Sequence, residues 1–172
     1  DIRFRFSTGL YYQSPSYKEI KDTVTQDNNL TYYLNKDIKS QRSFQVIAGM
    51  DYYYRFLRRP LKLSVDVYYK SLKNIITYNL DNVSIRYMGK NDAEGYAAGM
   101  DVKLFGEFVP GVDSWISFSL MRTMEDVSGD NYGYIPRPMD QLYNISIFFQ
   151  DYIPGLPQYR VHLLFNWAQG LP

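Results

Sequence analysis

The sequence predicts an all-β fold: an antiparallel up-and-down meander of about seven strands that is a fragment of a large transmembrane β-barrel. Three observations lead to this prediction. Apolar and polar residues alternate along most of the chain, long polar connections alternate with short turns containing Pro or Gly, and the predicted strands have roughly 10 residues. A tilted strand needs about that length to cross a bilayer, whereas strands of globular sheets usually have about 5–6 residues.

The stretch 61–70 shows the alternation most clearly. One side of an extended chain carries Leu61, Leu63, Val65, Val67 and Tyr69, and the other carries Lys62, Ser64, Asp66, Tyr68 and Lys70. A helix would place charged and apolar residues on the same stripe, so the pattern favours a strand. Its apolar side faces either a second sheet, as in a sandwich, or lipid, as in a transmembrane barrel.

Six further stretches alternate in the same way, and turn residues separate them. In chain order the predicted strands are 1–13, 42–55, 61–72 continuing into 74–80, a strand that begins near Val83 and resumes after Gly95, 115–123, 142–152 and 159–168. The third and fourth strands together predict a long hairpin that extends well past a bilayer.

The connections between these strands alternate in length. Residues 14–41 and 123–141 are long and polar, whereas the sequences FLRRP, Pro110-Gly111 and IPGLP are short. Within the first long connection, residues 18–24 predict a short helix with Ser16 as its cap. Short turns on one side and long loops on the other are typical of transmembrane barrels, and a Greek-key sandwich has no reason to follow this rhythm. Seven strands are too few for a closed bacterial barrel, so we expect residues 1–172 to form one partial barrel domain.

Composition narrows the possible functions. The formal net charge of +1 offers no electrostatic case for binding nucleic acid. The absence of cysteine excludes disulfides, thiolate metal sites and a cysteine nucleophile. The 18 tyrosines suit either ordinary strands or the aromatic belts where a barrel meets lipid headgroups. No phosphate loop, dinucleotide fingerprint, nucleophile elbow or zinc motif occurs, so we predict neither an enzyme nor a cofactor.

Four local motifs resemble one known family. They are RFSTGLYYQSP, LSVDVYYKSLKNIITY, GKNDAEGYAAGMDVKL and YIPRPMDQLYNISIFFQDYIPGLPQYRVHLLFNWAQGLP, and they occur in the order expected for that family. The chain resembles the C-terminal part of the barrel of TonB-dependent outer-membrane receptors, of the Bacteroidetes-like variety, over nearly its whole length.

The resemblance implies a barrel of about 22 strands that is occluded by an N-terminal plug. It implies location in the cell outer membrane and uptake of a scarce nutrient with energy from the inner-membrane TonB complex. We expect the plug, the TonB box and the final strands to lie outside residues 1–172. The expected partners are therefore outer-membrane lipid, the TonB complex through the missing N-terminal part, and a small or oligomeric nutrient at the outer loops 14–41, 73–95 and 123–141.

The alternation assigns candidate residues to the two faces of the barrel wall. The residues expected to face the water-filled lumen are Arg3, Arg5, Asp51, Lys62, Asp66, Lys70, Asp101, Lys103, Glu107 and His162. The residues expected to face lipid are Leu61, Leu63, Val65, Val67, Ile145, Ile147, Phe149, Val161, Leu163 and Phe165.

Two features of the sequence, the single histidine and an acidic cluster in the second long connection, could also serve as metal ligands. His162 is the only histidine, so we expect a hydrogen-bonded wall residue rather than a metal ligand. Glu125, Asp126, Asp130 and Asn131 could bind calcium, although their spacing departs from the EF-hand pattern and a solvated loop is the default expectation.

Two functions from different classes therefore remain open. The favoured one is a segment of an outer-membrane receptor that takes up a siderophore, glycan, peptide or similar nutrient. The alternative is a secreted, soluble β-sandwich that binds carbohydrate through surface Tyr and Trp. A sandwich requires the apolar strand faces to meet in a dry core, and a barrel requires them to face lipid.

Overall fold

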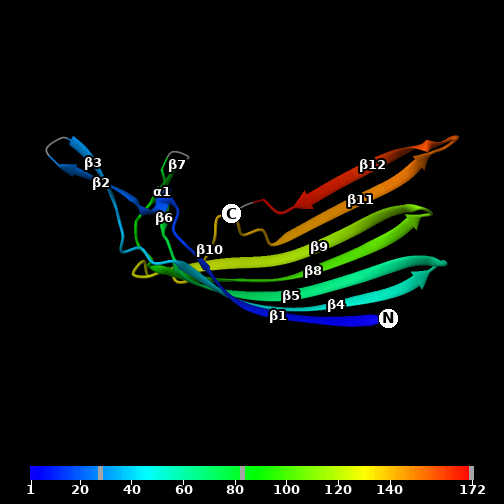
Figure 1. Cartoon of the computed structure of the whole chain (residues 1–172), viewed down its shortest axis with the longest axis horizontal. Helices are drawn as coiled ribbons and strands as arrows, with labels where there is room; N and C mark the ends of the chain where they lie inside the picture. The colour runs from blue at the N-terminus through cyan, green and yellow to red at the C-terminus, as the bar shows by residue number, and fades with distance from the viewer. Residues whose placement is uncertain (27–28, 82–83, 171–172) are drawn as a thin grey trace.

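The computed structural model describes residues 1–26, 29–81 and 84–170. Its main element is one antiparallel sheet in which the seven long strands follow the order β1-β4-β5-β8-β9-β11-β12, and a short eighth strand, β10, pairs with β9. Consecutive long strands are neighbours throughout. The predicted all-β antiparallel meander is therefore confirmed, and the sheet is not closed (Figure 1).

The long strands have 11 to 17 residues each. They are β1 (Ile2–Gln13), β4 (Gln41–Phe56), β5 (Arg59–Ile75), β8 (Ala93–Val109), β9 (Val112–Val127), β11 (Tyr143–Ile153) and β12 (Leu156–Ala168), and β10 is Ile135–Pro136. The three short turns, at 57–58, 110–111 and 154–155, lie at one end of the sheet, and the long connections lie at the other end (Figure 1).

The first long connection contains a one-turn helix, α1 (Tyr17–Ile20), followed by a hairpin of β2 (Lys21–Gln26) and β3 (Asn29–Leu34). Ser16 caps α1 as predicted, and the Glu19 carboxylate accepts a hydrogen bond from the Ser16 backbone N–H. The prediction of a helix over 18–24 is wrong beyond Ile20. There the chain satisfies its backbone groups by pairing with β3 instead of continuing the helix.

The predicted long hairpin of the third and fourth strands is also interrupted. β5 ends at Ile75, and β6 (Tyr78–Asp81) and β7 (Ser84–Tyr87) form a separate two-stranded sheet before β8 begins. The break follows from a register shift between Leu72 and Ile75, where Asn74 adopts a left-handed φ of 56°. The predicted start of the fourth strand near Val83 lies outside the described residues.

The base of this hairpin is tied to the sheet. Thr77 donates a hydrogen bond to Asp92 at 2.7 Å, and the Asn91 amide donates to the backbone oxygens of Asn74 and Lys39 at 2.8 and 2.9 Å. Ile75 and Ile76 are both buried there. Both hairpins project from the end of the sheet that carries the long connections (Figure 1).

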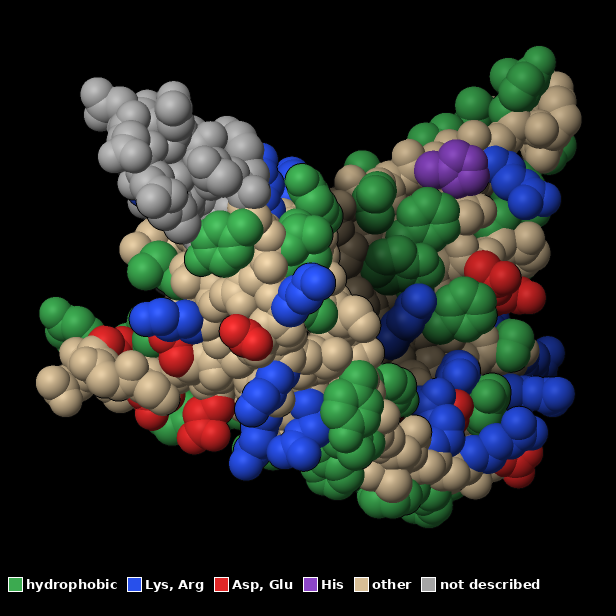
Figure 2. All heavy atoms as spheres, turned by 60° about the vertical axis from the view of Figure 1, so that its left-hand side comes forward, with side chains coloured by type: hydrophobic (Ala, Val, Ile, Leu, Met, Phe, Trp, Pro, Cys, Tyr) green, Lys and Arg blue, Asp and Glu red, His purple; other side chains and the backbone are tan. Residues whose placement is uncertain are grey.

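The sheet is a single curved layer, and in the described part of the chain no second sheet packs against it. Its apolar residues remain exposed: Val67 is 52% exposed and Phe165 is 51% exposed. The sandwich alternative is therefore wrong, because the apolar strand faces do not meet in a dry core. Figure 2 shows a hollow on one face of the molecule, in which hydrophobic and basic side chains are visible. Among the described residues, no helix combines the length and apolarity that crossing a membrane requires.

Candidate functional site

The strand register divides the side chains into two faces. Residues directly opposite each other in a ladder share a face, so the row Arg3, Asp51, Ser64, Lys103, Ser117, Ser146 and Asn166 lies on one face. We call it the polar face. The row Phe4, Met50, Val65, Val102, Phe118, Ile145 and Trp167 lies on the other, which we call the apolar face.

A charged cluster lies on the polar face across β1, β4 and β5. Arg5 contacts Asp66 at 2.9 Å and Asp51 at 3.2 Å, and Lys62 contacts Asp51 at 3.1 Å. The Ser64 hydroxyl donates to Asp51 at 2.6 Å. Asp51 is buried, and its carboxylate is satisfied by these three neighbours, which is the condition under which a buried charge is tolerated.

Gly49 makes room for this cluster. It sits between Arg5 and Asp66 in the register, so the Arg5 side chain must pass over it to reach the third strand. A Cβ at position 49 would collide with the Asp66 carboxylate and lie 3.1 Å from Arg5 Nη2. The small residue therefore allows an ion pair between two strands that are not neighbours.

A second group on the polar face consists of stacked rings. Lys103 Nζ lies 4.7 Å from the centre of the Trp115 ring, Trp115 stacks on Phe148 at 5.9 Å, and Phe148 stacks on His162 at 5.9 Å. The four side chains come from four successive strands, and a cation over an aromatic face is stabilising. The structure thus places His162 against a ring.

The other residues predicted to face the lumen take several positions. Arg3 lies over the Tyr53 ring, Lys70 lies over the Tyr68 ring, and Asp101 is opposite Asp66 in the register. Glu107 differs because the register of β8 against β9 shifts between Gly106 and Val109, and Glu107 lines a pocket together with Leu61 and Leu104 of the apolar face. Simple alternation therefore does not extend to Glu107.

The residues predicted to face lipid lie on the apolar face. They are either in the row given above or an even number of residues away from it along the same strand. Tyrosines lie at both ends of it: Tyr52 stacks on Tyr54 at 5.1 Å near the short turns, and Tyr96 contacts Tyr69 at 6.2 Å and Tyr134 at 5.6 Å near the long loops. From Leu61, which pairs with Tyr54, to Tyr69 there are eight residue steps, about 27 Å along the strand. A tilt of about 40° reduces this to about 20 Å, close to the height of a barrel's apolar band.

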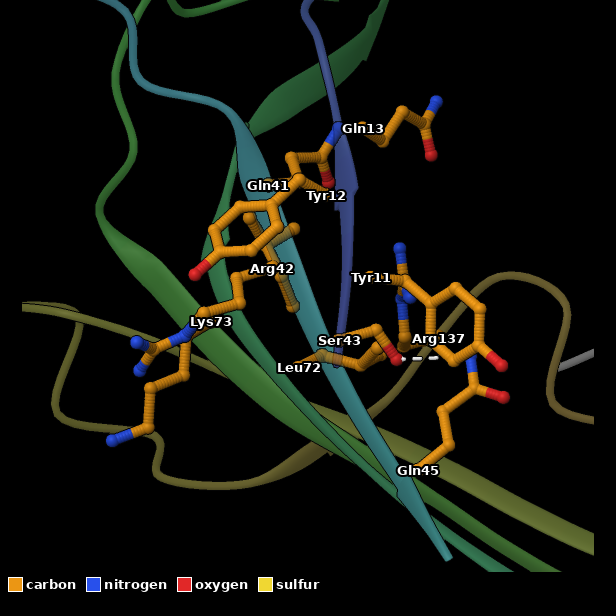
Figure 3. A pocket seen from close by; sticks show the side chains of 11 residues that line it. Tyr11, Tyr12, Gln13, Gln41, Arg42, Ser43, Gln45, Leu72, Lys73 and Arg137 are labelled. Atoms are coloured by element: carbon orange, nitrogen blue, oxygen red, sulfur yellow. Dashed lines mark hydrogen bonds between the residues drawn. The ribbon is translucent and has the colours of Figure 1, made fainter. Parts of the chain in front are cut away.

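A polar hollow of about 440 Å³ lies at the long-loop end of β1, β4 and β5. Tyr11, Ser43, Gln45 and Leu72 share the polar face there, and Arg137 approaches from the loop after β9 (Figure 3). Gln45 donates to the Ser43 hydroxyl at 3.2 Å. Phenol, amide, hydroxyl and guanidinium groups together can hydrogen-bond a polar ligand.

Backbone and side-chain contacts hold Arg137 in place. Its backbone N–H donates to Thr123 O at 3.0 Å, its guanidinium contacts Glu125 at 3.0 Å, and the Asp140 carboxylate accepts from the Thr123 N–H at 2.7 Å. Burial raises the pKa of the nearby Tyr78 phenol, and the charge of Glu125 adds to the rise.

Sequence reasoning did not select Tyr11, Gln45 or Arg137 as site residues. The alternation of β1 and β4 already placed Tyr11 and Gln45 on the polar face. Arg137 lies in the PRPMDQ motif, but nothing local in that motif indicates that it folds back over β9.

The calcium alternative gains no support from geometry. Glu94 and Asp126 oppose each other in the register and line a hollow with Asp130 and Asn131, but no group of three or more acidic or histidine side chains suited to a metal ion occurs among the described residues.

Comparison with known proteins agrees with this architecture. The family model described as "TonB dependent receptor-like, beta-barrel" matches residues 1–171. No match was found among curated proteins or among solved structures. An unclosed antiparallel meander with short turns at one end and long loops at the other, together with a match over the whole length, assigns the family: the chain belongs to the TonB-dependent receptor-like β-barrels, which are transporters of the bacterial outer membrane and not enzymes.

Proposed function

We propose that residues 1–172 are part of a larger barrel of the Bacteroidetes-like variety, and that the complete receptor takes up a scarce nutrient with energy supplied through TonB. The family itself implies outer-membrane transport, interaction with TonB and a transported ligand. The proposal adds the partial nature of the domain, the direction of the two faces and the position of ligand contact.

The two open edges of the sheet carry this proposal. β1 pairs with β4 alone and β12 with β11 alone in the described part of the chain, so each leaves a row of backbone groups without a strand neighbour. Phe4 and Phe6 on β1 are 80% and 73% exposed, and Leu163 on β12 is 61% exposed. In a bilayer an unpaired backbone group costs several kcal/mol, so further strands of the complete protein would pair with both edges.

The chemistry of the faces supports their direction. Carboxylates and ammonium groups cluster on the polar face, where a wet lumen would solvate them, and the apolar face has rows of Leu, Val, Ile and Phe between two groups of tyrosines. We assign the polar face to the lumen and the apolar face to lipid.

We further propose that nutrient contacts the hollow around Tyr11, Gln45 and Arg137. It lies at the long-loop end, which is the outer side of such barrels. Its groups suit the hydroxyl, amide or carboxylate groups of glycans, siderophores or peptides.

The test uses the complete receptor, fractionated from its own cells and then purified in detergent. It should be recovered with the outer membrane, and one class from a panel of oligosaccharides, ferric siderophores and oligopeptides should bind in calorimetric titration. Arg137→Gln should weaken that binding at least about tenfold, because a charge-assisted hydrogen bond contributes about 1.5–3 kcal/mol.

Arg86→Gln is the matched control, because Arg86 is an exposed arginine on β7 of another loop and does not line the hollow. Recovery of the receptor in the soluble fraction would overturn the proposed location. Equal affinity of the Arg137 variant and wild type would overturn the proposed site.

A further inference from the structure

The turn between β4 and β5 differs from the other two short turns in its backbone. Leu57 and Arg58 have φ values of 51° and 67°, a left-handed conformation at both central residues of a two-residue hairpin. Such turns favour Asn-Gly, because other side chains are strained there. The other two turns use Pro-Gly, with Gly111 and Gly155 at φ values of 79° and 81°. Strain retained at an exposed turn points to a function of its side chains.

The side chains presented by this turn are apolar and basic. Phe56 is 60% exposed, Leu57 is 75% exposed, and Arg58 is exposed at the tip. In the described part of the chain, none of the salt bridges includes Arg58 or Arg59. The turn between β8 and β9 has the acidic residues Glu107 and Asp113 close by in sequence, and Glu107 also reaches the lining of the groove beside the β4–β5 turn.

A mostly apolar groove of about 420 Å³ lies beside the turn. Its walls are Tyr54, Phe56, Leu57, Leu61, Leu104 and Phe108, and Arg59 and Glu107 complete the lining. Tyr54, Leu61 and Leu104 belong to the apolar face, because each is an even number of residues from a member of its row along the same strand. The Arg59 guanidinium donates to the Phe108 backbone oxygen, and this contact holds its charge at the groove.

We propose that this groove binds an anionic phospholipid of the leaflet reached by the short turns. An acyl chain lies along the apolar walls, the Phe56 and Leu57 side chains enter the membrane, and the lipid phosphate pairs with Arg58 and Arg59. A phosphate matches the planar donors of arginine, and an apolar groove that opens on the lipid-facing side suits an acyl chain. The inference rests on the proposed function, since it requires the apolar face to meet lipid.

The first experiment compares lipid retention by the complete receptor. The purified receptor is incubated with phosphatidylglycerol or phosphatidylcholine in detergent, and bound lipid is counted by native mass spectrometry. Wild type should retain phosphatidylglycerol preferentially. Arg58→Gln should lower that retention about fivefold, and Arg58→Gln with Arg59→Gln should lower it further, because each basic residue near a lipid surface contributes about 1 kcal/mol.

Arg160→Gln is the matched control, because Arg160 lies near the third short turn but on the polar face, over the Tyr152 ring. Leu57→Asn with Arg58→Gly keeps the turn type and relieves its strain, so the hairpin should fold while phosphatidylglycerol retention falls. Equal retention of the two lipids by wild type, or unchanged retention in this folded double variant, overturns the proposal.

The second experiment measures the depth of the turn. Residues 1–172 contain no cysteine, so in a complete receptor whose remaining cysteines, if any, are replaced by serine, spin labels at Leu57→Cys and, in a second variant, Pro110→Cys report on single positions. In vesicles of phosphatidylethanolamine and phosphatidylglycerol, the label at 57 should be reached by oxygen and shielded from a water-soluble nickel reagent, and the label at 110 should be open to both. Equal access of nickel to the two labels contradicts membrane insertion of the turn.

The two proposals fail in different ways. A receptor that does not fractionate with the outer membrane refutes the proposed function itself. A receptor that resides there, but shows neither lipid preference nor a shielded label at 57, refutes the lipid groove alone.

Discussion

Single residues decide how charges are tolerated on the polar face. Asp51 is buried in a wall without a conventional core, and it is accommodated because Arg5, Lys62 and Ser64 all reach its carboxylate. This arrangement depends on Gly49, over which the Arg5 side chain passes to reach Asp66. The glycine therefore acts through the space it leaves, not through its backbone freedom.

Gly49→Val is expected to destabilise the complete barrel by about 1–3 kcal/mol, because the new side chain displaces Asp66 and separates it from Arg5. Urea unfolding in lipid vesicles, followed by tryptophan fluorescence, measures the change. Ala48→Val is the control on the opposite, exposed face and should stay within about 0.5 kcal/mol of wild type. If the Gly49 variant is as stable as this control, the space left for Asp66 at position 49 does not contribute to the free energy of unfolding.

At the scale of elements, pairing overrides local preference in the long connections. Residues 18–24 have a helical pattern and a cap, yet the helix ends after one turn because the following residues pair in the hairpin of β2 and β3. The segment 135–140 similarly folds back over β9 through β10 and through Asp140, which accepts from Thr123 and contacts Arg122 at 3.4 Å. This contact places Arg137 at the hollow.

Asp140→Ala should release the 135–140 segment from β9, because the buried Thr123 N–H and Arg122 both lose their acceptor. The backbone N–H groups of this segment, which Pro136 and Pro138 lack, should then exchange hydrogen about tenfold faster, as measured by mass spectrometry on the complete receptor. Asp140→Asn keeps an amide oxygen for Thr123 and should show a smaller effect. Equal exchange rates in wild type and the Ala variant would mean that other contacts hold the segment.

At the scale of the whole molecule, the sheet has two exposed faces and two open edges. Few side chains are buried, and the buried apolar ones among the described residues are Leu61, Ile75, Ile76, Ala93 and Val112. These are concentrated near the turns and loop bases, not along the middle of the sheet. A wall of this kind acquires its stability from neighbouring strands and from the surrounding lipid.

Ile145→Arg should destabilise the complete receptor in vesicles by about 2–4 kcal/mol, because it places a guanidinium in the middle of the apolar face. Ser146→Arg, on the next residue, should cost much less because that side chain lies on the polar face. Urea titration of both variants in the same vesicles ranks them. The reverse ranking would show that the two faces had been assigned to the wrong environments.

The sequence by itself determined the seven long strands, the short turns and the division of side chains into two faces, because alternation is a local property with a period of two residues. It did not predict β2, β3 and β10 within the long connections. Val65 and Asp66 lie on opposite sides in any extended conformation. The same reasoning predicted the meander, because short turns force consecutive strands to pair antiparallel. Alternation does not predict the position of Glu107, because the register of β8 against β9 shifts after Gly106 and Glu107 then lies beside Leu61.

Only the tertiary structure decided which residues meet. Arg5 and Asp66 are 61 positions apart, and their contact depends on the register of two strand pairs at once. The approach of Arg137 to Tyr11 and the groove beside Leu57 likewise require distant strands and turns to be placed in space. A local pattern states which side a residue faces, but register and loop packing arise from long-range pairing, and they alone bring side chains together into a site.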